Sequence, residues 1–309
     1  MPSPALELHH VSKSFGAFQA VRDLSFAVPQ GCVFGFLGPN GAGKTTTLRM
    51  VLDIFRPTSG SIAVLGAPSA FDVRHRIGYL PEEKGLYKKM KSWAVIAYLA
   101  SLKGIDRRTA GRRARVLLER YGLGAVAETK IEALSKGMAQ KVQVLAAIAH
   151  EPELVIFDEP FSGLDPVNQA VLEEVITTLR SEGRTLVFST HVMQHAERLC
   201  DRLLIMSRGA KIFEGTLKEA RRTQPVRVRL HSEEDLDFLS AVPGATGLEA
   251  RGGGEWELRL TSDADPQAVL EACFARHVRL RSYNAAEPTL HDVFVNLVGP
   301  EAREARADA

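Results

Sequence analysis

The sequence predicts an α/β protein in two parts, a mostly parallel sheet covered by helices and then a small α+β domain. Short, wholly apolar segments such as residues 154–157 are typical of strands that are buried on both faces of a parallel sheet. These segments alternate with helical patterns, which favours helical crossovers between parallel strands. After about residue 223 the pattern of elements changes. We therefore expect two domains, at residues 1–222 and 223–300.

The composition is that of an ordinary globular chain and excludes several other classes. The 309 residues suit about two domains of roughly 150 residues each. A hydrophobic content of 45% can bury a core, and a net charge of +2 excludes a strongly basic nucleic-acid-binding arm. No apolar run reaches the roughly 18 residues of a membrane span, and the first ten residues have no secretory signal pattern. Cys32, Cys200 and Cys273 form no CxxC pair, so we expect neither disulfides nor a zinc site.

Strand and helix patterns alternate along the first part of the chain. The predicted strands are residues 6–11, 18–28, 32–37, 154–157 and 185–189, with a hairpin at residues 203–206 and 211–214. The predicted helices are residues 44–55, 136–150, 168–181 and 192–200, and residues 93–121 are helical throughout. In this last segment the apolar spacing predicts that Leu102, Val116, Leu117 and Leu118 face inward.

The second part has a different order of elements. Its predicted strands are residues 226–230, 246–251, 255–260 and 278–283, and its predicted helices are residues 233–242 and 267–277. Together they give β-α-β-β-α-β, which is the ferredoxin-like order. A last helix at residues 289–298 precedes a charged tail at residues 301–309, which we expect to be disordered.

A glycine-rich loop joins the strand at residues 32–37 to the helix at residues 44–55. It matches the GxxxxGK(S/T) pattern and consists of Gly38, Pro39, Asn40, Gly41, Ala42, Gly43, Lys44 and Thr45. Such a loop wraps backbone N–H groups around phosphate oxygens, and the helix N-terminus adds a positive dipole. The alternative is a glycine turn that only caps a helix, but chance produces this pattern in roughly 1% of chains of this length. The loop therefore predicts nucleoside triphosphate binding, with Lys44 at the β- and γ-phosphates, the Thr45 hydroxyl on Mg²⁺ and Thr46 among the contacts.

Two adjacent carboxylates, Asp158 and Glu159, follow the apolar strand at residues 154–157. Ligands of parallel sheets bind at the carboxyl ends of the strands. Asp158 is therefore expected to hold Mg²⁺ through water, and Glu159 to act as the general base toward the attacking water. The alternative, that both acids only make the strand end soluble, loses weight beside the phosphate-binding loop.

The order of these motifs resembles that of the ATP-binding subunits of ABC transporters over residues 5–215. This resemblance makes ATP the expected nucleotide, and it implies an antiparallel β subdomain and a helical subdomain at about residues 88–150. Residues 134–138, Leu-Ser-Lys-Gly-Met, resemble the family signature, which is usually LSGGQ. The Ser135 hydroxyl and the Gly137 N–H are expected to hold the γ-phosphate of ATP on a second protomer.

Three further residues take expected roles from the resemblance. Asp165, which ends the sequence Ser-Gly-Leu-Asp, resembles the loop that crosses the dimer interface. His191 resembles the switch histidine that contacts the γ-phosphate and orients Glu159. Phe15 occupies the place of an aromatic that stacks on adenine, and a core aromatic is an equally weighted alternative.

The chain also departs from the family pattern. Glu82 stands where the family usually has the glutamine of the Q-loop; a carboxylate can still accept from water or ligate Mg²⁺, but it adds negative charge near the γ-phosphate. Lys136 and Met138 replace Gly and Gln in the signature. These variants resemble a bacterial branch of sodium- and drug-export ATPases, which also ends in a small domain with a motif like residues 287–294. That domain is expected to be either regulatory, binding a small ligand or the permease, or a packing appendage that stabilises a dimer.

Five arginines, Arg107, Arg108, Arg112, Arg113 and Arg115, form a cluster that could be a nucleic-acid patch. They lie on a helical segment without interleaved aromatics, so a solvated face, or one toward lipid headgroups and a membrane partner, is the favoured interpretation. No nucleic-acid partner is expected.

These observations predict an ATPase subunit that dimerises around two ATP molecules and drives a separate membrane permease, most simply an exporter of sodium ion or drug-like cargo. It is expected in the cytoplasm, at the inner face of the plasma membrane. The alternative is an ABC ATPase that acts on nucleic acid or ribosomes, but such relatives usually carry long coiled coils, zinc modules or tandem cassettes. A P-loop kinase or GTPase is a poorer alternative, because the signature and His191 would then have no role.

Overall fold

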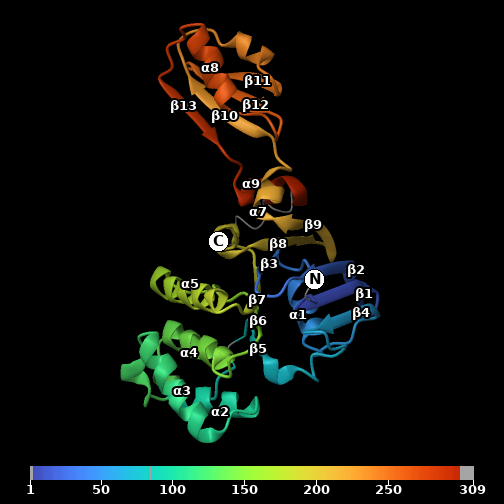
Figure 1. Cartoon of the computed structure of the whole chain (residues 1–309), viewed down its shortest axis with the longest axis vertical. Coiled ribbons are helices and arrows are strands. Elements are labelled where there is room, and N and C mark those ends of the chain that lie inside the picture. Colours follow the sequence, from blue (N-terminus) through green and yellow to red (C-terminus); the bar gives the residue numbers. More distant parts are fainter. Residues whose placement is uncertain (1–2, 84, 300–309) are drawn as a thin grey trace. The chain divides into compact units, whose positions relative to one another are not determined.

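The computed structural model describes residues 3–83 and 85–299 of the chain. The chain folds into two compact units that divide between Glu214 and Gly215 (Figure 1). The predicted tail at residues 301–309 lies outside the described residues. Among the described residues, no helix combines the length and the apolar content needed to cross a membrane.

A six-stranded sheet forms the centre of the first unit, in the order β5-β6-β7-β3-β8-β9. Neighbouring strands from β5 to β8 pair in parallel, as the apolar segments predicted. The strands are β5 (Ile77–Leu80), β6 (Leu154–Phe157), β7 (Thr185–Thr190), β3 (Val33–Leu37), β8 (Arg202–Ser207) and β9 (Ala210–Thr216). Strand β5 was not expected from the sequence, because its four residues give too short a pattern to recognise alone.

A second sheet of three antiparallel strands, in the order β2-β1-β4, lies on one side of the central sheet with helix α1 (Figure 1). Its strands are β1 (Leu6–Phe15), β2 (Phe18–Val28) and β4 (Ser59–Val64), and α1 spans Lys44–Val51. Alternate side chains of β3 point to opposite faces, so Phe34 and Phe36 join the core on this side. Val33 joins the core that faces the other helices.

The remaining helices of this unit pack on the opposite face of the sheet, with α2, α3 and α4 grouped together (Figure 1). They are α2 (Ser92–Leu102), α3 (Arg107–Arg120), α4 (Lys136–Ile148), α5 (Pro166–Ser181) and α6 (Met193–Leu199). The predicted segment 93–121 is thus two helices, and Asp106 caps the second by accepting from the Thr109 N–H.

Two inward-facing predictions in this segment are wrong. Leu102 is 63% exposed and Val116 is 60% exposed, whereas Leu118 is fully buried and Leu117 is half-buried. The buried stripe of α3 runs through Ala110, Ala114 and Leu118. A residue two positions along a helix points about 200° away, so Val116 lies on the face opposite Ala114.

The second unit has a four-stranded antiparallel sheet in the order β11-β12-β10-β13, which is the ferredoxin-like order. Its elements are α7 (Leu217–Arg221), β10 (Val226–His231), β11 (Ala245–Gly252), β12 (Glu255–Leu260), α8 (Gln267–Ala275), β13 (Ser282–Ala286) and α9 (Leu290–Val298). The last strand begins four residues later than the predicted residue 278. Helix α7 packs against α9, so this compact unit begins before the predicted boundary at residue 222.

The helix predicted at residues 233–242 is only a short 3₁₀ segment, Asp237–Ala241. The Asp235 carboxylate accepts from the Asp237 N–H at 2.9 Å, and such a local bond competes with a regular helix. Leu236 and Leu239 are nevertheless buried, so the segment still covers the sheet.

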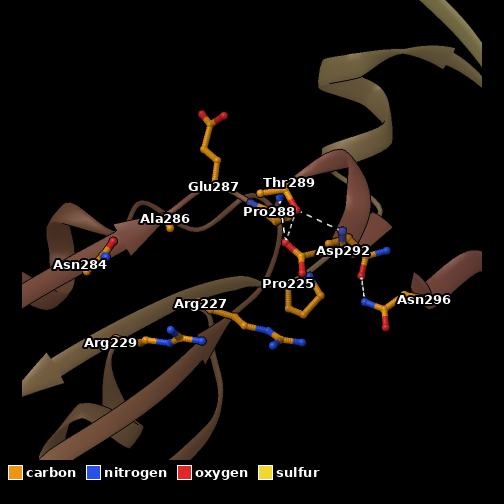
Figure 2. Close-up of a pocket in the computed structure, with 11 residues that line it drawn as sticks. Pro225, Arg227, Arg229, Asn284, Ala286, Glu287, Pro288, Thr289, Asp292 and Asn296 are labelled. Atoms are coloured by element: carbon orange, nitrogen blue, oxygen red, sulfur yellow. Dashed lines mark hydrogen bonds between the residues drawn. The ribbon is translucent and has the colours of Figure 1, made fainter. Parts of the chain in front are cut away.

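A pocket of about 160 Å³ lies in the second unit between β10, β13 and the start of α9 (Figure 2). Arg227 and Arg229 extend into it from β10, and Asn284 lies on β13. On the other side Asp292 accepts from the Thr289 N–H at 3.0 Å and from its hydroxyl at 2.6 Å, which caps α9. None of the predicted site residues lines this pocket, so the candidate site must be sought in the first unit.

Candidate nucleotide-binding site

The glycine-rich loop lies between the end of β3 at Leu37 and the start of α1 at Lys44. Gly43 begins the helix with φ of 98°, in the left-handed region that favours glycine. A Cβ at this position would lie 2.6 Å from the carbonyl oxygen of Ala20, so a larger residue would displace the loop. Asn40 and Gly41 are exposed at the tip, and Thr46 is half-buried in the first turn of the helix. The loop therefore presents its backbone toward solvent at the carboxyl end of β3.

Lys44 is buried within this loop. Its Nζ donates to the carbonyl oxygens of Gly38 at 2.8 Å and Pro39 at 3.3 Å. The same Nζ lies 3.3 Å from Oε1 of Glu159. The loop lysine and the second acid of the strand end, which are far apart in the sequence, therefore form one ion pair.

Asp158 is buried at the end of β6. Its Oδ1 accepts from the Ser189 hydroxyl at 2.6 Å and from the Thr45 hydroxyl at 3.2 Å. Its Oδ2 is buried without a hydrogen-bond partner among the described residues. Burial raises the pKa of Asp158, while the two hydroxyl bonds oppose that rise. An unpartnered carboxylate oxygen beside a hydroxyl is a donor set of the hard oxygen type that Mg²⁺ takes, so these residues fit the ion.

Glu159 is held on both sides of its carboxylate. Oε1 pairs with Lys44, and Oε2 lies 3.0 Å from Nδ1 of His191. Burial raises the pKa of Glu159, but the His191 hydrogen bond and the Lys44 charge outweigh it, so the pKa is lowered overall. The hydrogen bond that His191 donates to Glu159 correspondingly raises the pKa of His191. Glu159 is thus an ionised carboxylate with one cation and one imidazole beside it.

Ser189, at the end of β7, is a site residue that the sequence analysis did not assign. Its hydroxyl donates to Asp158 and accepts from the Glu159 N–H at 2.8 Å, so it holds both acids. A hydroxyl residue near the end of an otherwise apolar predicted strand is the sequence signal that could have found it, because such a hydroxyl needs a partner when the strand is buried.

Glu82 is exposed and lies just beyond β5. It lines a cleft of about 390 Å³ together with Asp158, Glu159, Gln140 and Gly163. After the larger effect of Glu159, the Glu82 charge also contributes to the raised pKa of His191. The structure therefore places Glu82 in the same cleft as the acid pair.

The signature residues Ser135 and Gly137 lie at the start of α4, and Lys136 between them lines the same cleft as Glu159. Ser135 caps this helix by accepting from the Met138 N–H at 3.2 Å. A Cβ on Gly137 would lie 2.2 Å from the Asn168 side chain of α5, so a larger residue there would displace that amide. Asp165 caps α5 and accepts twice from Asn168, at 2.9 Å and 2.5 Å. Among the described residues, no hydrogen bond or ion pair joins Ser135 or Gly137 to the phosphate-binding loop.

Phe15 is 45% exposed at the end of β1, so it is not a core aromatic. Its ring meets Phe55 edge-on at 5.6 Å, and the Lys13 ammonium lies 5.1 Å from the ring centroid. The exposure leaves ring surface available for stacking.

Comparisons with known proteins agree with this geometry. Residues 21–162 match the family described as ABC transporter, and residues 215–298 match the family described as ATP-binding protein DrrA1-3-like, C-terminal domain. The chain is 41% identical over 295 residues to the uncharacterized ABC transporter ATP-binding protein YhaQ of Bacillus subtilis strain 168, covering 95% of this chain and 98% of that protein. It is 32% identical over 310 residues to the linearmycin resistance ATP-binding protein LnrL of the same strain, covering 97% and 100%.

A solved structure described as the ATP binding subunit of an ABC transporter superimposes with a TM-score of 0.65 at 32% identity, over 71% of this chain and 92% of that chain. The chain belongs to the ATP-binding subunits of ABC transporters. The family resemblance and the fold class predicted from the sequence are therefore confirmed.

Proposed function

We propose that this ATP-binding subunit hydrolyses ATP, and that two copies close around two ATP molecules to drive a separate membrane permease in the direction of export. The observation that carries the proposal is the cluster at the carboxyl ends of β3, β6 and β7. There an ionised Glu159 lies between Lys44 and His191, next to the buried Asp158. A carboxylate held in this way is ready to accept a proton at the edge of the sheet where ligands bind.

The phosphate-binding loop and the first acid form the nucleotide side of the site. When ATP binds, the Lys44 ammonium leaves the loop carbonyls and Glu159 and contacts the β- and γ-phosphates. Charged phosphate oxygens are strong acceptors for an ammonium. The Thr45 hydroxyl and the free Oδ2 of Asp158 would hold Mg²⁺, which offsets negative charge on the phosphates when bound. Phe15 offers a ring face to adenine.

Glu159 is the general base for water in this proposal. Once Lys44 has moved to the phosphates, Oε1 is free to accept the proton of the attacking water, while His191 keeps Oε2 in place. His191 would then contact the γ-phosphate through its other nitrogen. Glu82 lines the same cleft and would place a further negative charge near the γ-phosphate.

The second copy completes each site. Ser135 and Gly137 stand at the N-terminus of the thirteen-residue helix α4, where backbone N–H groups attract an anion. Because they make no bond to the phosphate-binding loop of their own chain, the ATP of a partner chain is the proposed ligand. Asp165, fixed by Asn168, would lie in the loop between the two copies.

The proposed cargo and location come from the comparisons. One relative is named for linearmycin resistance, and the second unit matches a DrrA1-3-like domain, which together support export of a drug-like molecule. Sodium ion is the other proposed cargo. The proposed place is the cytoplasmic face of the plasma membrane, bound to permease subunits and not to nucleic acid.

The test uses two variants that damage different halves of the composite site. Lys44→Ala removes the cation of the phosphate-binding loop, and Ser135→Arg blocks the signature. Each homodimer should be inactive. In a mixed dimer one site carries both defects, but the other combines an intact loop with an intact signature, so steady-state phosphate release should recover on mixing.

Two controls make this test decisive. Lys44→Ala and Ser135→Arg chains that carry different affinity tags, with Glu159→Gln added to prevent turnover, report by co-purification whether mixed dimers form. Wild-type chains mixed with Lys44→Ala chains report whether one intact site is enough for turnover. If both controls succeed and the Lys44→Ala and Ser135→Arg mixture stays inactive, the signature does not act on the ATP of the partner.

A further inference from the structure

The turn that carries Glu159 is held in an unfavourable backbone conformation. Glu159 has φ of 46°, in the left-handed region that non-glycine residues rarely adopt. Such a conformation persists only when the surrounding structure holds it. Ser189 accepts the Glu159 N–H at 2.8 Å, and the Ser162 N–H donates to the Glu159 carbonyl at 3.1 Å. The next residue is Pro160, which has no N–H to offer, so its carbonyl is the remaining backbone group of the turn.

Gln140 supplies the bond to that carbonyl. Its Nε2 donates to the Pro160 oxygen at 2.8 Å, and the side chain is 7% exposed. Gln140 stands on α4, the helix that begins with the signature at Ser135. It also lines the cleft that contains Asp158 and Glu159. One helix thus carries the signature at its start and a contact to the catalytic turn about one turn later.

Burying the Gln140 amide costs free energy unless the hydrogen bond to Pro160 compensates for it. Its Oε1 is buried without a hydrogen-bond partner among the described residues. A buried acceptor of this kind is unfavourable, and a leucine or methionine of similar size would fill the space without it. Packing alone therefore does not account for a glutamine here, whereas the bond to Pro160 does.

We infer that Gln140 is a positioning residue for the reaction, which holds the Glu159–Pro160 turn so that the carboxylate faces the phosphate side of the cleft. The inference rests on the proposed function, in which Glu159 accepts the proton of water. In this role Gln140 acts through the Pro160 carbonyl and not through a contact of its own to the nucleotide. It also fixes the spacing between the signature and the Glu159 turn within one chain.

The test compares Gln140→Leu with Gln143→Leu in the full chain. Gln143 is the matched control, because it lies one turn along α4, is 8% exposed, and donates to the Glu83 carbonyl at 3.2 Å instead of Pro160. Gln140→Leu should lower kcat about tenfold, as expected for a misplaced catalytic group, and leave ATP binding unchanged. Gln143→Leu should lower kcat by clearly less. Equal losses in both variants would mean that the packing of α4 matters and the Pro160 bond does not.

A second variant, Gln140→Glu, separates hydrogen bonding from shape. The charged groups that line the cleft with this position are Glu82, Glu83, Asp158, Glu159 and, one turn earlier on α4, Lys136. The four carboxylates and the burial favour the neutral form of a new carboxyl group. When neutral it can donate to Pro160, and when ionised it repels that carbonyl. The ratio of its kcat to that of the wild type should therefore rise as the pH falls from 8.5 to 6, while the ratio for Gln140→Leu stays flat.

These outcomes can be told apart from a failure of the proposed function. If Glu159→Gln keeps wild-type turnover, the role of Glu159 is wrong, and the role of Gln140 with it. If Glu159→Gln is inactive while Gln140→Leu keeps wild-type kcat, only the inference about Gln140 is overturned. A ratio for Gln140→Glu that falls as the pH falls would overturn it as well.

Discussion

Each unit of the molecule buries one glutamate beside cations, and the two surroundings differ in kind. Glu159 follows β6, is held by Lys44 and His191 from neighbouring strand ends, and opens on a cleft of about 390 Å³. Glu257 lies in the middle of β12 and is 1% exposed beneath arginines of the same sheet face. Arg251 lies 2.9 Å from its carboxylate and Arg229 lies 3.5 Å away.

Burial of a charged side chain therefore does not by itself mark a reactive site. The side chains of Arg251 and Arg229 are 49% and 69% exposed, and they cover the carboxylate of Glu257. The partners of Glu159 instead leave its carboxylate beside a cleft at the carboxyl edge of a parallel sheet, where a ligand can enter. We therefore expect a catalytic role for the first glutamate and a structural role for the second.

The largest expected effect is on turnover. Glu159→Gln should keep ATP binding and lower the rate of phosphate release by about 10²–10⁴, which is the usual contribution of a general base. The same change in the second unit, Glu257→Gln, should leave the rate within about twofold of the wild type, because the ion pairs of Glu257 are with arginines of the second unit and not with residues of the site. Steady-state phosphate release and equilibrium ATP binding measure both. Equal losses of turnover in the two variants would mean that the catalytic role assigned to Glu159 and the structural role assigned to Glu257 are not distinct.

The next effect is on stability and should be confined to the second unit. Glu257→Gln leaves three guanidinium groups without their shared acid, at a cost of about 1–2 kcal/mol; the cost stays below that of a fully buried pair because the arginines remain partly hydrated. Native-state hydrogen exchange of the β10 and β12 amides measures it. The control is Glu249→Gln, which breaks an exposed pair with Arg259 in the same sheet and should cost under about 0.5 kcal/mol. If Glu249→Gln lowers the free energy of unfolding as much as Glu257→Gln does, the burial of Glu257 adds nothing to its contribution to stability.

A smaller effect is the pH dependence of the Glu159–His191 pair. The pKa of His191 is raised from 6.5, so its contribution to stability is present below pH 6.5 and is lost as the pH rises through the folded value. The pKa of Glu159 is lowered from 4.5, so its contribution is present above pH 4.5 and is lost as the pH falls through the folded value. The pair therefore stabilises most between about pH 4.5 and 6.5.

The measurement is the free energy of unfolding of the first unit with and without the imidazole. His191→Gln should cost under about 1 kcal/mol at pH 6, because His191 is partly exposed, and less at pH 8.5. Glu257→Gln should cost the same at both pH values, because the guanidinium groups do not titrate in this range. A cost of His191→Gln that grows with pH would contradict the assigned direction.

The smallest effect concerns Glu82, the exposed acid on the cleft. If its carboxylate lies near the γ-phosphate, Glu82→Gln removes one unfavourable charge and should tighten ATP binding about 2–5-fold at fixed Mg²⁺. Titration of ATP at two salt concentrations measures this, since screening should reduce the gain. The same change should alter coupling to the permease. Unchanged affinity together with unchanged transport would show that Glu82 points into solvent.

The local features of the site could be predicted from the sequence because they are written in consecutive residues. The loop from Gly38 to Thr45 needs glycines at set places, since a Cβ on Gly43 would meet a backbone carbonyl. The strand at residues 154–157 is wholly apolar and ends in two acids, which placed Asp158 and Glu159 at the edge of a buried sheet. The order of strands and helices likewise followed from alternating patterns, apart from the short strands β4 and β5 and the reduced helix at residues 237–241.

The partners of these residues could be decided only by the tertiary structure. Thr45 meets Asp158, and Ser189 joins both acids, because β3, β6 and β7 lie side by side in the sheet and end at one edge. No periodicity within one segment can predict which strand ends become neighbours. The same holds for the bond from Gln140 to Pro160 and for the exposed faces of Leu102 and Val116. By itself the sequence determined which chemical groups were present and which local geometry they would take. The packing of distant segments decided which of these groups meet, because those contacts depend on the order of strands in the whole sheet.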